Sequence, residues 1–405
     1  MSIIRPFHAI RPAPERASLV ASVPYDVVSE KEARELGHKN PWSFLHISRA
    51  EINLPEGTSP YSDAVYECAA TQFKEFIKNC PLLQESKPSI YVYRLRMGFH
   101  EQTGIAGCFS LDEYERGLIK KHERTRKEKE DDRTRHVSEL SAQTGPVFLA
   151  YKSVEKINLE VERIKGRKPL YDFVSEDQVN HTVWAIEDTA QLVEFFATQV
   201  QALYIADGHH RAAAADRVRK QSLSQNPQHT GSEDYNFLFA VAFPHDQLQI
   251  LPYHRAIKDL NGMTTAEYLK KLGADFELTP GDRSLPPKGE FGMYLESKWY
   301  RLRQKICTHD LDVAILQDKV LNSILGIQDP RTDRRIDFIG GIRGTEELER
   351  TVDSGAAKLA FSLHPTRLEE VMEVSDKEEI MPPKSTWFEP KLRDGLLSYR
   401  FNLNQ

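Results

Sequence analysis

Cysteine is scarce in this chain of 405 residues, and its positions are too scattered to form a disulfide framework or a cysteine-based zinc module. Such sparse usage is typical of proteins in a reducing compartment rather than of secreted scaffolds. No C-x-x-C pair occurs among the four, which are Cys68, Cys80, Cys108 and Cys307.

Long apolar runs are lacking as well. No segment approaches the roughly 18–20 consecutive apolar residues that span a bilayer. Near the start of the chain, the hydrophobic core of a secretion signal would be interrupted by Arg5, Pro6, Arg11, Pro12 and Pro14. We therefore expect a soluble, cytoplasmic protein with no membrane partner.

Neither sign of charge dominates, because 54 Lys and Arg face 60 Asp and Glu, for a formal charge of −6. The chain as a whole is therefore not attracted to nucleic acid. The run at 120–135 is rich in both signs, and its opposite charges four positions apart predict a solvated helix. No helix-turn-helix pattern accompanies it, so we expect no nucleic-acid partner.

Apolar residues make up 40% of the sequence and aromatic residues 9%, which is enough to build packed cores. Residues 60–78 carry the periodicity of an amphipathic helix, and alternation at 89–98 predicts a strand with a hairpin partner at 101–111. A helix near 30–36 is predicted to end at Gly37. Helices and strands alternate without the regular period of a doubly wound fold, which favours a mixed α/β or α+β fold.

The length of the chain favours two or three domains. The sequence becomes highly charged after Leu118, and a last strand-like stretch precedes Lys258. We expect an N-terminal α/β region, a central core and a C-terminal α/β region, with bounds 1–118, 119–257 and 258–405.

The most informative segment is the run at 203–219. Its first residues have the composition of a short buried strand, Asp207 and Gly208 make a tight turn, and a run of alanines carries a helix that starts near His209. Backbone N–H groups at a helix start, together with the positive end of the helix dipole, form an anion site. The pattern predicts a phosphate-binding loop at 207–211.

Each side chain of this loop has a candidate role. Gly208 lets the backbone approach a ligand closely, and Arg211 adds a fork of donors to a phosphate. Asp207 can hold Mg²⁺ through water or orient a histidine. Either His209 or His210 can donate to the charge that develops on a transferred phosphoryl group.

Two other interpretations of this loop stay open. In the first, the loop is structural: Asp207 caps the helix, Gly208 makes the turn and the two histidines are exposed. In the second, the histidines bind zinc, and a further ligand comes from a distant part of the chain, for example His122 or His181.

Two loops in the last third of the chain compete as ligand sites. Residues 335–344 form a glycine loop after which Thr345 caps a helix, but two glutamates in the first turn of that helix would repel an anion, which favours a structural turn. The tail segment at 382–391 either clamps a phosphate or carboxylate or only docks its aromatic residues onto the core. The charged run at 329–335 is open between a salt-bridge cluster and a substrate clamp. Candidate substrate-binding residues in these segments are Lys384, Ser385, Thr386 and Arg331.

The run Asp207-Gly208-His209-His210-Arg211, followed by alanines, is similar to the D-G-H-H-R signature of the free-serine kinases in the ParB/sulfiredoxin superfamily. In that superfamily, this strand–turn–helix holds nucleotide phosphates. Over essentially the whole chain, the sequence also resembles a domain family of unknown function, numbered 1015. The segments that carry this second resemblance are VPYDV at 23–27, KHERT at 121–125, IADGHHR at 205–211, DPRTDRRIDFIGG at 329–341 and MPPKSTWFEPKL at 381–392.

The kinase resemblance implies a general base. In those kinases a glutamate on an early segment faces the phosphate loop and takes the proton of the substrate hydroxyl. Glu123 stands at the matching place, ahead of a helix, a strand at 145–151 and the loop, with an insertion at 152–202. The alternative is that Glu123 pairs with Lys127 on an exposed helix.

These observations predict a ParB/sulfiredoxin-like core at 119–257 in a kinase that phosphorylates free L-serine or a similar small metabolite. ATP or ADP would be the nucleotide, with Mg²⁺, and the candidate catalytic residues are Glu123, Asp207, His209 and His210. The alternative is a non-catalytic or regulatory nucleotide-binding module of the same superfamily. A sulfiredoxin-like reductase is excluded, because it needs a cysteine where the two histidines stand.

Overall fold

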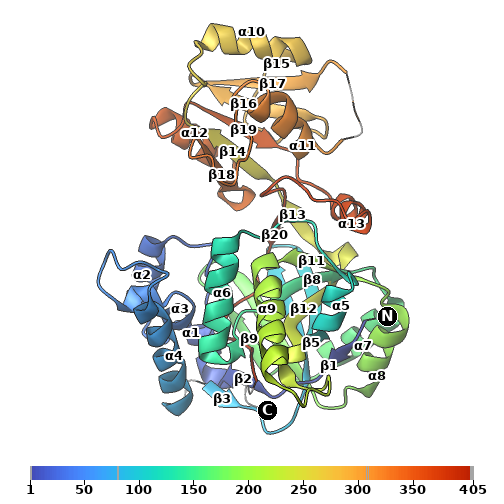
Figure 1. The fold of residues 1–405 in the computed structure, drawn as a ribbon. Coiled ribbons are helices and arrows are strands. Elements are labelled where there is room, and N and C mark those ends of the chain that lie inside the picture. The colour runs from blue at the N-terminus through green and yellow to red at the C-terminus, as the bar shows by residue number, and fades with distance from the viewer. Residues whose placement is uncertain (1, 80–81, 307, 309, 402–405) are drawn as a thin grey trace. The chain divides into compact units, whose positions relative to one another are not determined.

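The structure is a computed structural model and describes residues 2–79, 82–306, 308 and 310–401 (Figure 1). Internal contacts divide the chain into two units, the first formed by Met1–Leu248 and Pro390–Gln405 and the second by Gln249–Glu389. Both units combine helices with β-sheet, so the predicted mixed α/β fold is confirmed. The three-region division that the sequence indicates stays a prediction.

A mixed nine-stranded sheet forms the centre of the first unit. Along the sheet the strands lie in the order β6 (Ile119–Lys120), β11 (Leu203–Asp207), β8 (Val147–Tyr151), β12 (Phe237–Pro244), β5 (His100–Ser110), β4 (Ile90–Met97), β10 (Val179–Ile186) and β9 (Tyr171–Val174), with β1 (Ile4–Arg5) also paired to β5. The β4–β5 hairpin confirms the predicted strand and its partner. The strands β8, β11 and β12 are apolar runs buried over nearly their whole length, as expected inside a sheet covered on both faces.

The pairing of β11 determines where the phosphate-binding loop predicted from the sequence lies. β11 runs parallel to β6, with Leu203 opposite Ile119, and antiparallel to β8, with Tyr204 opposite Ala150. Parallel neighbours end at the same edge of a sheet. The residues that follow β6 and those that follow β11 are therefore brought together, although His122 and His209 are 87 positions apart in sequence.

Two helices of the first unit carry the segments around this edge. α6 (Lys127–Leu140) and α9 (His209–Gln225) pack side by side (Figure 1). Ala212 and Ala215 of α9 join the main apolar core of the unit, which also contains side chains of β8 and β11. Their small size lets the helix approach the sheet closely.

A second apolar cluster in the first unit is built on α4 (Asp63–Lys78), which confirms the amphipathic helix predicted at 60–78. Its Phe73 and Phe76 are buried there. The other helices of the unit are η1 (Pro14–Arg16), α1 (Ala17–Val20), α2 (Glu30–Lys39), α3 (Leu45–Ser48), η2 (Ala50–Asn53), α5 (Leu111–Glu115), α7 (Glu155–Lys165), α8 (Ala190–Gln199), η3 (Asp234–Asn236) and η4 (His245–Gln247). A small sheet returns the end of the chain to this unit through the strand order β3 (Leu82–Gln84), β2 (Ala9–Pro12), β21 (Ser398–Arg400) and β7 (Ala142–Gln143).

Two predictions about helix ends in this unit are wrong. The charged run predicted to be helical from residue 120 becomes a helix only at Lys127, because Ile119 and Lys120 are held in the pairing with β11. Gly37 does not end a helix but lies inside α2. A Cβ atom at this position would stand 2.6 Å from Cδ1 of Ile52, so close packing explains the glycine.

The second unit contains an antiparallel six-stranded sheet in the order β15 (Phe276–Pro280), β17 (Lys298–Gln304), β16 (Glu290–Leu295), β19 (Leu359–Leu363), β14 (Tyr253–Ile257) and β18 (Ile336–Gly340). A separate pair joins β13 (Gln249–Leu251) to β20 (Trp387–Glu389). The helices are α10 (Thr265–Asp275), α11 (Asp312–Leu316), η5 (Gln317–Asn322), η6 (Gly341–Arg343), α12 (Glu346–Asp353) and α13 (Leu368–Asp376). Thr345 precedes α12 but does not cap it, because its hydroxyl donates to the carbonyl of Arg283 at 2.8 Å.

In the part of the chain that the structure describes, no helix combines the length and the apolar character that crossing a membrane requires.

Candidate functional site

The strand–turn–helix predicted at 203–219 is present. β11 ends at Asp207, and α9 begins at His209. Gly208 between them has φ of 92°, a left-handed conformation that favours glycine. Asp207 does not cap the helix in the usual way, since its Oδ1 accepts a hydrogen bond from the N–H of Gly208 at 2.8 Å. The first turn of α9 thus presents its N–H groups and the positive end of its dipole at the turn.

The other carboxylate oxygen of Asp207 faces a lysine that sequence reasoning missed. Nζ of Lys391 lies 2.7 Å from Oδ2 of Asp207, and the lysine side chain is largely buried. Lys391 belongs to the segment that returns to the first unit after residue 389. It is 184 positions from Asp207 in the sequence. No local pattern indicates such a pair. Both oxygens of Asp207 therefore have partners, and the role of this carboxylate as a magnesium ligand stays a prediction.

Glu123 lies in the segment between β6 and α6, next to the loop. The carboxylate of Glu123 and ring nitrogens of His122 and His209 all lie within 4.8 Å of one another. The two imidazole rings meet edge to face with centroids 4.5 Å apart, and both histidines are buried. The structure therefore brings together Glu123 and the start of α9, as the kinase resemblance implies. Glu123 precedes α6, so it does not share an exposed helix face with Lys127.

Each histidine of the loop holds the segment that carries Glu123. Nε2 of His209 accepts a long hydrogen bond of 3.5 Å from the backbone N–H of His122. Nε2 of His210 accepts one of 3.1 Å from the backbone N–H of Arg126. The two bonds fasten both ends of the segment 122–126 to the first turn of α9. His209 is buried, which contradicts the interpretation that both histidines are exposed.

Burial lowers the pKa of His122 to about 4, although the nearby Asp207 carboxylate opposes this. Burial also lowers the pKa of His209 well below its usual value, and His122 adds to the effect. Both imidazoles are therefore neutral at neutral pH.

Arg211 turns away from the loop surface into the first unit. Its Nη1 donates to the carbonyl of Pro146 at 2.9 Å, and its Nη2 lies 3.6 Å from Oδ1 of Asp26. Burial alone would lower the pKa of Arg211, but the Asp394 and Asp26 carboxylates outweigh this and raise it. The VPYDV segment thus meets the loop through Asp26, and the predicted contact of Arg211 with a phosphate stays a prediction.

Of the two distant histidines considered as zinc ligands, one lies beside the loop and the other does not. His122 lies against His209, as described above. His181 is instead bonded through Nδ1 to the Tyr93 hydroxyl at 2.8 Å and through Nε2 to Ser175 at 3.0 Å. Burial lowers the pKa of His181 to about 3, so this ring is a neutral member of an internal hydrogen-bond network.

The candidate substrate-binding residues of the tail and of the charged run belong to the second unit. Arg331 forms two hydrogen bonds of 2.8 Å with the carboxylate of Asp329, the geometry of a local salt bridge. The Ser385 hydroxyl donates to the carbonyl of Pro382 at 2.6 Å. Lys384 has a left-handed backbone, and Thr386 directly precedes β20. Their role in binding a substrate stays a prediction.

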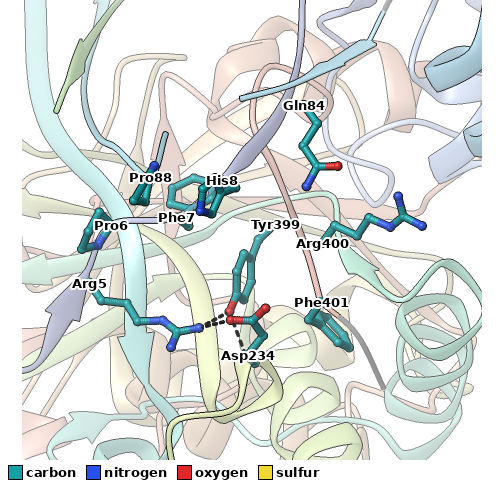
Figure 2. Close-up of a pocket in the computed structure, with 10 residues that line it drawn as sticks. All are labelled: Arg5, Pro6, Phe7, His8, Gln84, Pro88, Asp234, Tyr399, Arg400 and Phe401. Carbon is teal, nitrogen blue, oxygen red and sulfur yellow. Dashed lines mark hydrogen bonds and ion pairs between the residues drawn. The ribbon is translucent and has the colours of Figure 1, made fainter. Parts of the chain in front are cut away.

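A pocket of about 560 Å³ lies elsewhere in the first unit (Figure 2). At its wall, Arg5 donates to the Tyr399 hydroxyl at 2.6 Å and pairs with Asp234. Asp234 follows the end of α9, whereas His209 begins this helix, and 17 residues of α-helix span about 25 Å. The pocket is therefore separate from the loop. Residues near both ends of the chain line it together with Gln84, Pro88 and Asp234, so no single motif could have indicated it.

Comparison with known proteins found no match among curated proteins. Among solved structures, the chain is similar to a conserved hypothetical protein from Pyrococcus furiosus, with a TM-score of 0.38 and 17% identity over 74% of this chain and 95% of that one. It is also similar to a free serine kinase in complex with AMP, with a TM-score of 0.39 and 17% identity over 74% and 92% of the two chains. For SbnI from Staphylococcus aureus the TM-score is 0.36 and the identity 10%, over 74% and 83%.

The family described as "Protein of unknown function (DUF1015)" matches residues 4–321. This stretch includes the strand–turn–helix, the segment with Glu123 and the whole central sheet of the first unit. The chain belongs to this family, as its sequence resemblance predicted.

Proposed function

We propose that this protein is a nucleotide-dependent kinase that phosphorylates the hydroxyl of free L-serine or of a similar small metabolite. The observation that carries the proposal is the position of the Glu123 carboxylate, within 4.8 Å of the His209 ring at the start of α9. A carboxylate beside a phosphate-binding helix start can take the proton of an alcohol as that alcohol attacks a bound phosphoryl group.

The reaction is a direct transfer. The substrate oxygen forms a bond to the terminal phosphorus of ATP or ADP, the bond from that phosphorus to the bridging oxygen breaks, and the hydroxyl proton passes to Glu123. The nucleotide leaves with one phosphate fewer. Mg²⁺ enters with the nucleotide as part of the substrate, and Asp207, held by Gly208 and Lys391, can contact it through water. We place this chemistry in the cytoplasm.

The remaining residues of the site position the reactants. Backbone N–H groups after Gly208 and the dipole of α9 support binding of the nucleotide phosphates. Lys391 holds Asp207, and the Gly208 N–H is fixed by the same carboxylate. His209 and His210 fasten the segment that carries the base, so the distance from Glu123 to the loop is set before substrate binds.

Phosphorus NMR of the purified protein with Mg²⁺, L-serine and, in separate samples, ATP, ADP or CTP tests the proposal. We expect an O-phosphoserine resonance with the wild type and none with Glu123→Gln. Glu128→Gln, which alters an exposed carboxylate of α6, is the matched control and should retain turnover. Nucleotide binding without any transfer would favour the non-catalytic module, and absence of nucleotide binding would overturn the phosphate-loop assignment as well.

A further inference from the structure

Two imidazoles and a carboxylate converge at the edge of the central sheet. His122 and Glu123 follow β6, and His209 begins α9, so the parallel pairing of β6 with β11 brings them together. One ring nitrogen of each histidine and one oxygen of Glu123 lie within 4.8 Å of one another. In the part of the chain that the structure describes, no other trio of histidine, cysteine or acidic side chains is this close.

The surrounding structure fixes the two histidine side chains. His122 and His209 are 2% and 6% exposed, and their rings pack edge to face. The bond from the backbone of Arg126 to His210 holds the far end of the segment. The strand pairing and two backbone contacts therefore set the positions of the two histidines, and Glu123 follows His122 directly in the chain. Ligands held in this way lose little conformational entropy when they bind an ion.

We propose that His122, Glu123 and His209 bind one divalent transition-metal ion of the zinc class. Imidazole nitrogens suit Zn²⁺ and Co²⁺, whereas Mg²⁺ requires a shell of oxygen ligands. With bonds of about 2.0–2.1 Å, tetrahedral zinc needs ligand atoms about 3.3 Å apart, so closing the site from separations of up to 4.8 Å takes a shift of up to about 1.5 Å. Three protein ligands leave a fourth position for water or a substrate oxygen.

This site differs from the magnesium that accompanies the nucleotide, and it does not rest on the kinase activity. It does bear on that activity. A Glu123 carboxylate that coordinates a cation is no longer available to take a proton. Zinc-loaded protein is therefore expected to be inactive in the proposed transfer, while its metal binding can be measured with no nucleotide present.

The test uses full-length protein freed of metal with a chelator, titrated with Zn²⁺ in a calorimeter and with Co²⁺ in a visible spectrophotometer. We expect one ion per chain with micromolar or tighter affinity and visible cobalt bands of nitrogen and oxygen coordination. Glu123→Gln and His209→Gln should each weaken zinc binding at least tenfold and remove the cobalt bands. His38→Gln, at an exposed histidine of α2, is the matched control and should bind as the wild type does.

Circular dichroism and the thermal transition of each metal-free variant show whether it is folded. His209 is buried, so His209→Gln could fail to fold. Glu123 is only partly buried, so Glu123→Gln then decides the outcome. The proposal is overturned if the wild type binds no Zn²⁺ at 100 µM, or if a folded Glu123→Gln binds Zn²⁺ as tightly as the wild type.

Discussion

The backbone of Gly208 gives the loop its shape. A Cβ atom here would stand 3.5 Å from Cα of Val147, an ordinary contact, so the left-handed φ of 92° is the constraint rather than space. We expect Gly208→Ala to lower the free energy of unfolding by about 1–2 kcal/mol. It should also weaken ATP or ADP binding at least tenfold, since relief of the strain turns the N–H groups of the loop. Urea denaturation and calorimetry measure the two effects.

Gly231 provides a control for this prediction. It has the same φ of 92°, and a Cβ atom there would meet nothing within 4 Å, but it lies in a surface loop beyond the end of α9. Gly231→Ala should cost similar stability and leave nucleotide binding unchanged. Equal losses of binding in both variants would show that Gly208 acts through stability alone.

Asp394 carries a pH dependence of stability. It is 2% exposed, and burial raises its pKa to about 6, against the opposing effect of Arg211. The folded state thus holds this proton more tightly than the unfolded chain, where an aspartate titrates near 3.8. The stabilisation is complete below that unfolded pKa and is lost as pH rises through about 6.

We therefore expect Asp394→Asn, which cannot ionise, to gain stability relative to the wild type as pH rises from 4.5 to 8. The change in the difference between their free energies of unfolding should be about 2 kcal/mol. Urea denaturation of both proteins at several pH values measures it. A difference that stays constant with pH would mean that Asp394 is ionised throughout, as a partner of Arg211.

The sequence identified the residues of the loop but not their partners. Glycine in a turn and alanines after it determine the local backbone conformation, so the turn at Gly208 could be predicted from the sequence. The direction of Arg211 depends on Asp26, and that of Asp207 on Lys391, which are remote in sequence. These contacts exist only once the sheet has formed, and no local spacing encodes them.

At the level of elements, the bond between α9 and the segment before α6 is open to test. His210 accepts from the backbone of Arg126 and so holds the segment that carries Glu123. Loss of one such bond costs about 1 kcal/mol. We expect His210→Ala to lower kcat of the proposed kinase about fivefold, with the KM for nucleotide within twofold, and His210→Gln to restore part of the loss.

Steady-state kinetics distinguishes this positioning role from direct contact with the ligand. If His210 instead touches the phosphates, His210→Ala will raise the KM for nucleotide and the glutamine variant will not help. The thermal transition of each variant should stay near that of the wild type, since the ring of His210 lies near the surface.

Strong periodicity made several elements predictable. In α4 the apolar residues recur along one face of the helix, and in the β4–β5 hairpin they recur along the strands. Both elements lie where expected. The predicted start of α6 was wrong because the pairing of β6 with β11 outweighs the helical preference of the residues before Lys127. Such long-range competition is invisible to a local pattern.

For the whole molecule, the second unit is an insertion in the first. The chain leaves after Leu248 and returns at Pro390, and Gln249 pairs directly with Glu389. Antiparallel partners lie about 4.5–5.5 Å apart at Cα. A short glycine-serine linker can therefore join Leu248 to Pro390. We expect the shortened chain to fold, because the two large apolar clusters consist of first-unit residues alone.

The shortened chain should bind ATP or ADP and Zn²⁺ within threefold of the full-length protein, since Glu123, the 207–211 loop and Lys391 all remain. A cooperative thermal transition establishes folding, and calorimetry measures both affinities. A shortened chain that folds but binds neither ligand would contradict the assignment of both binding sites to the first unit. Retained nucleotide binding without transfer to serine would show that turnover, unlike binding, requires residues 249–389.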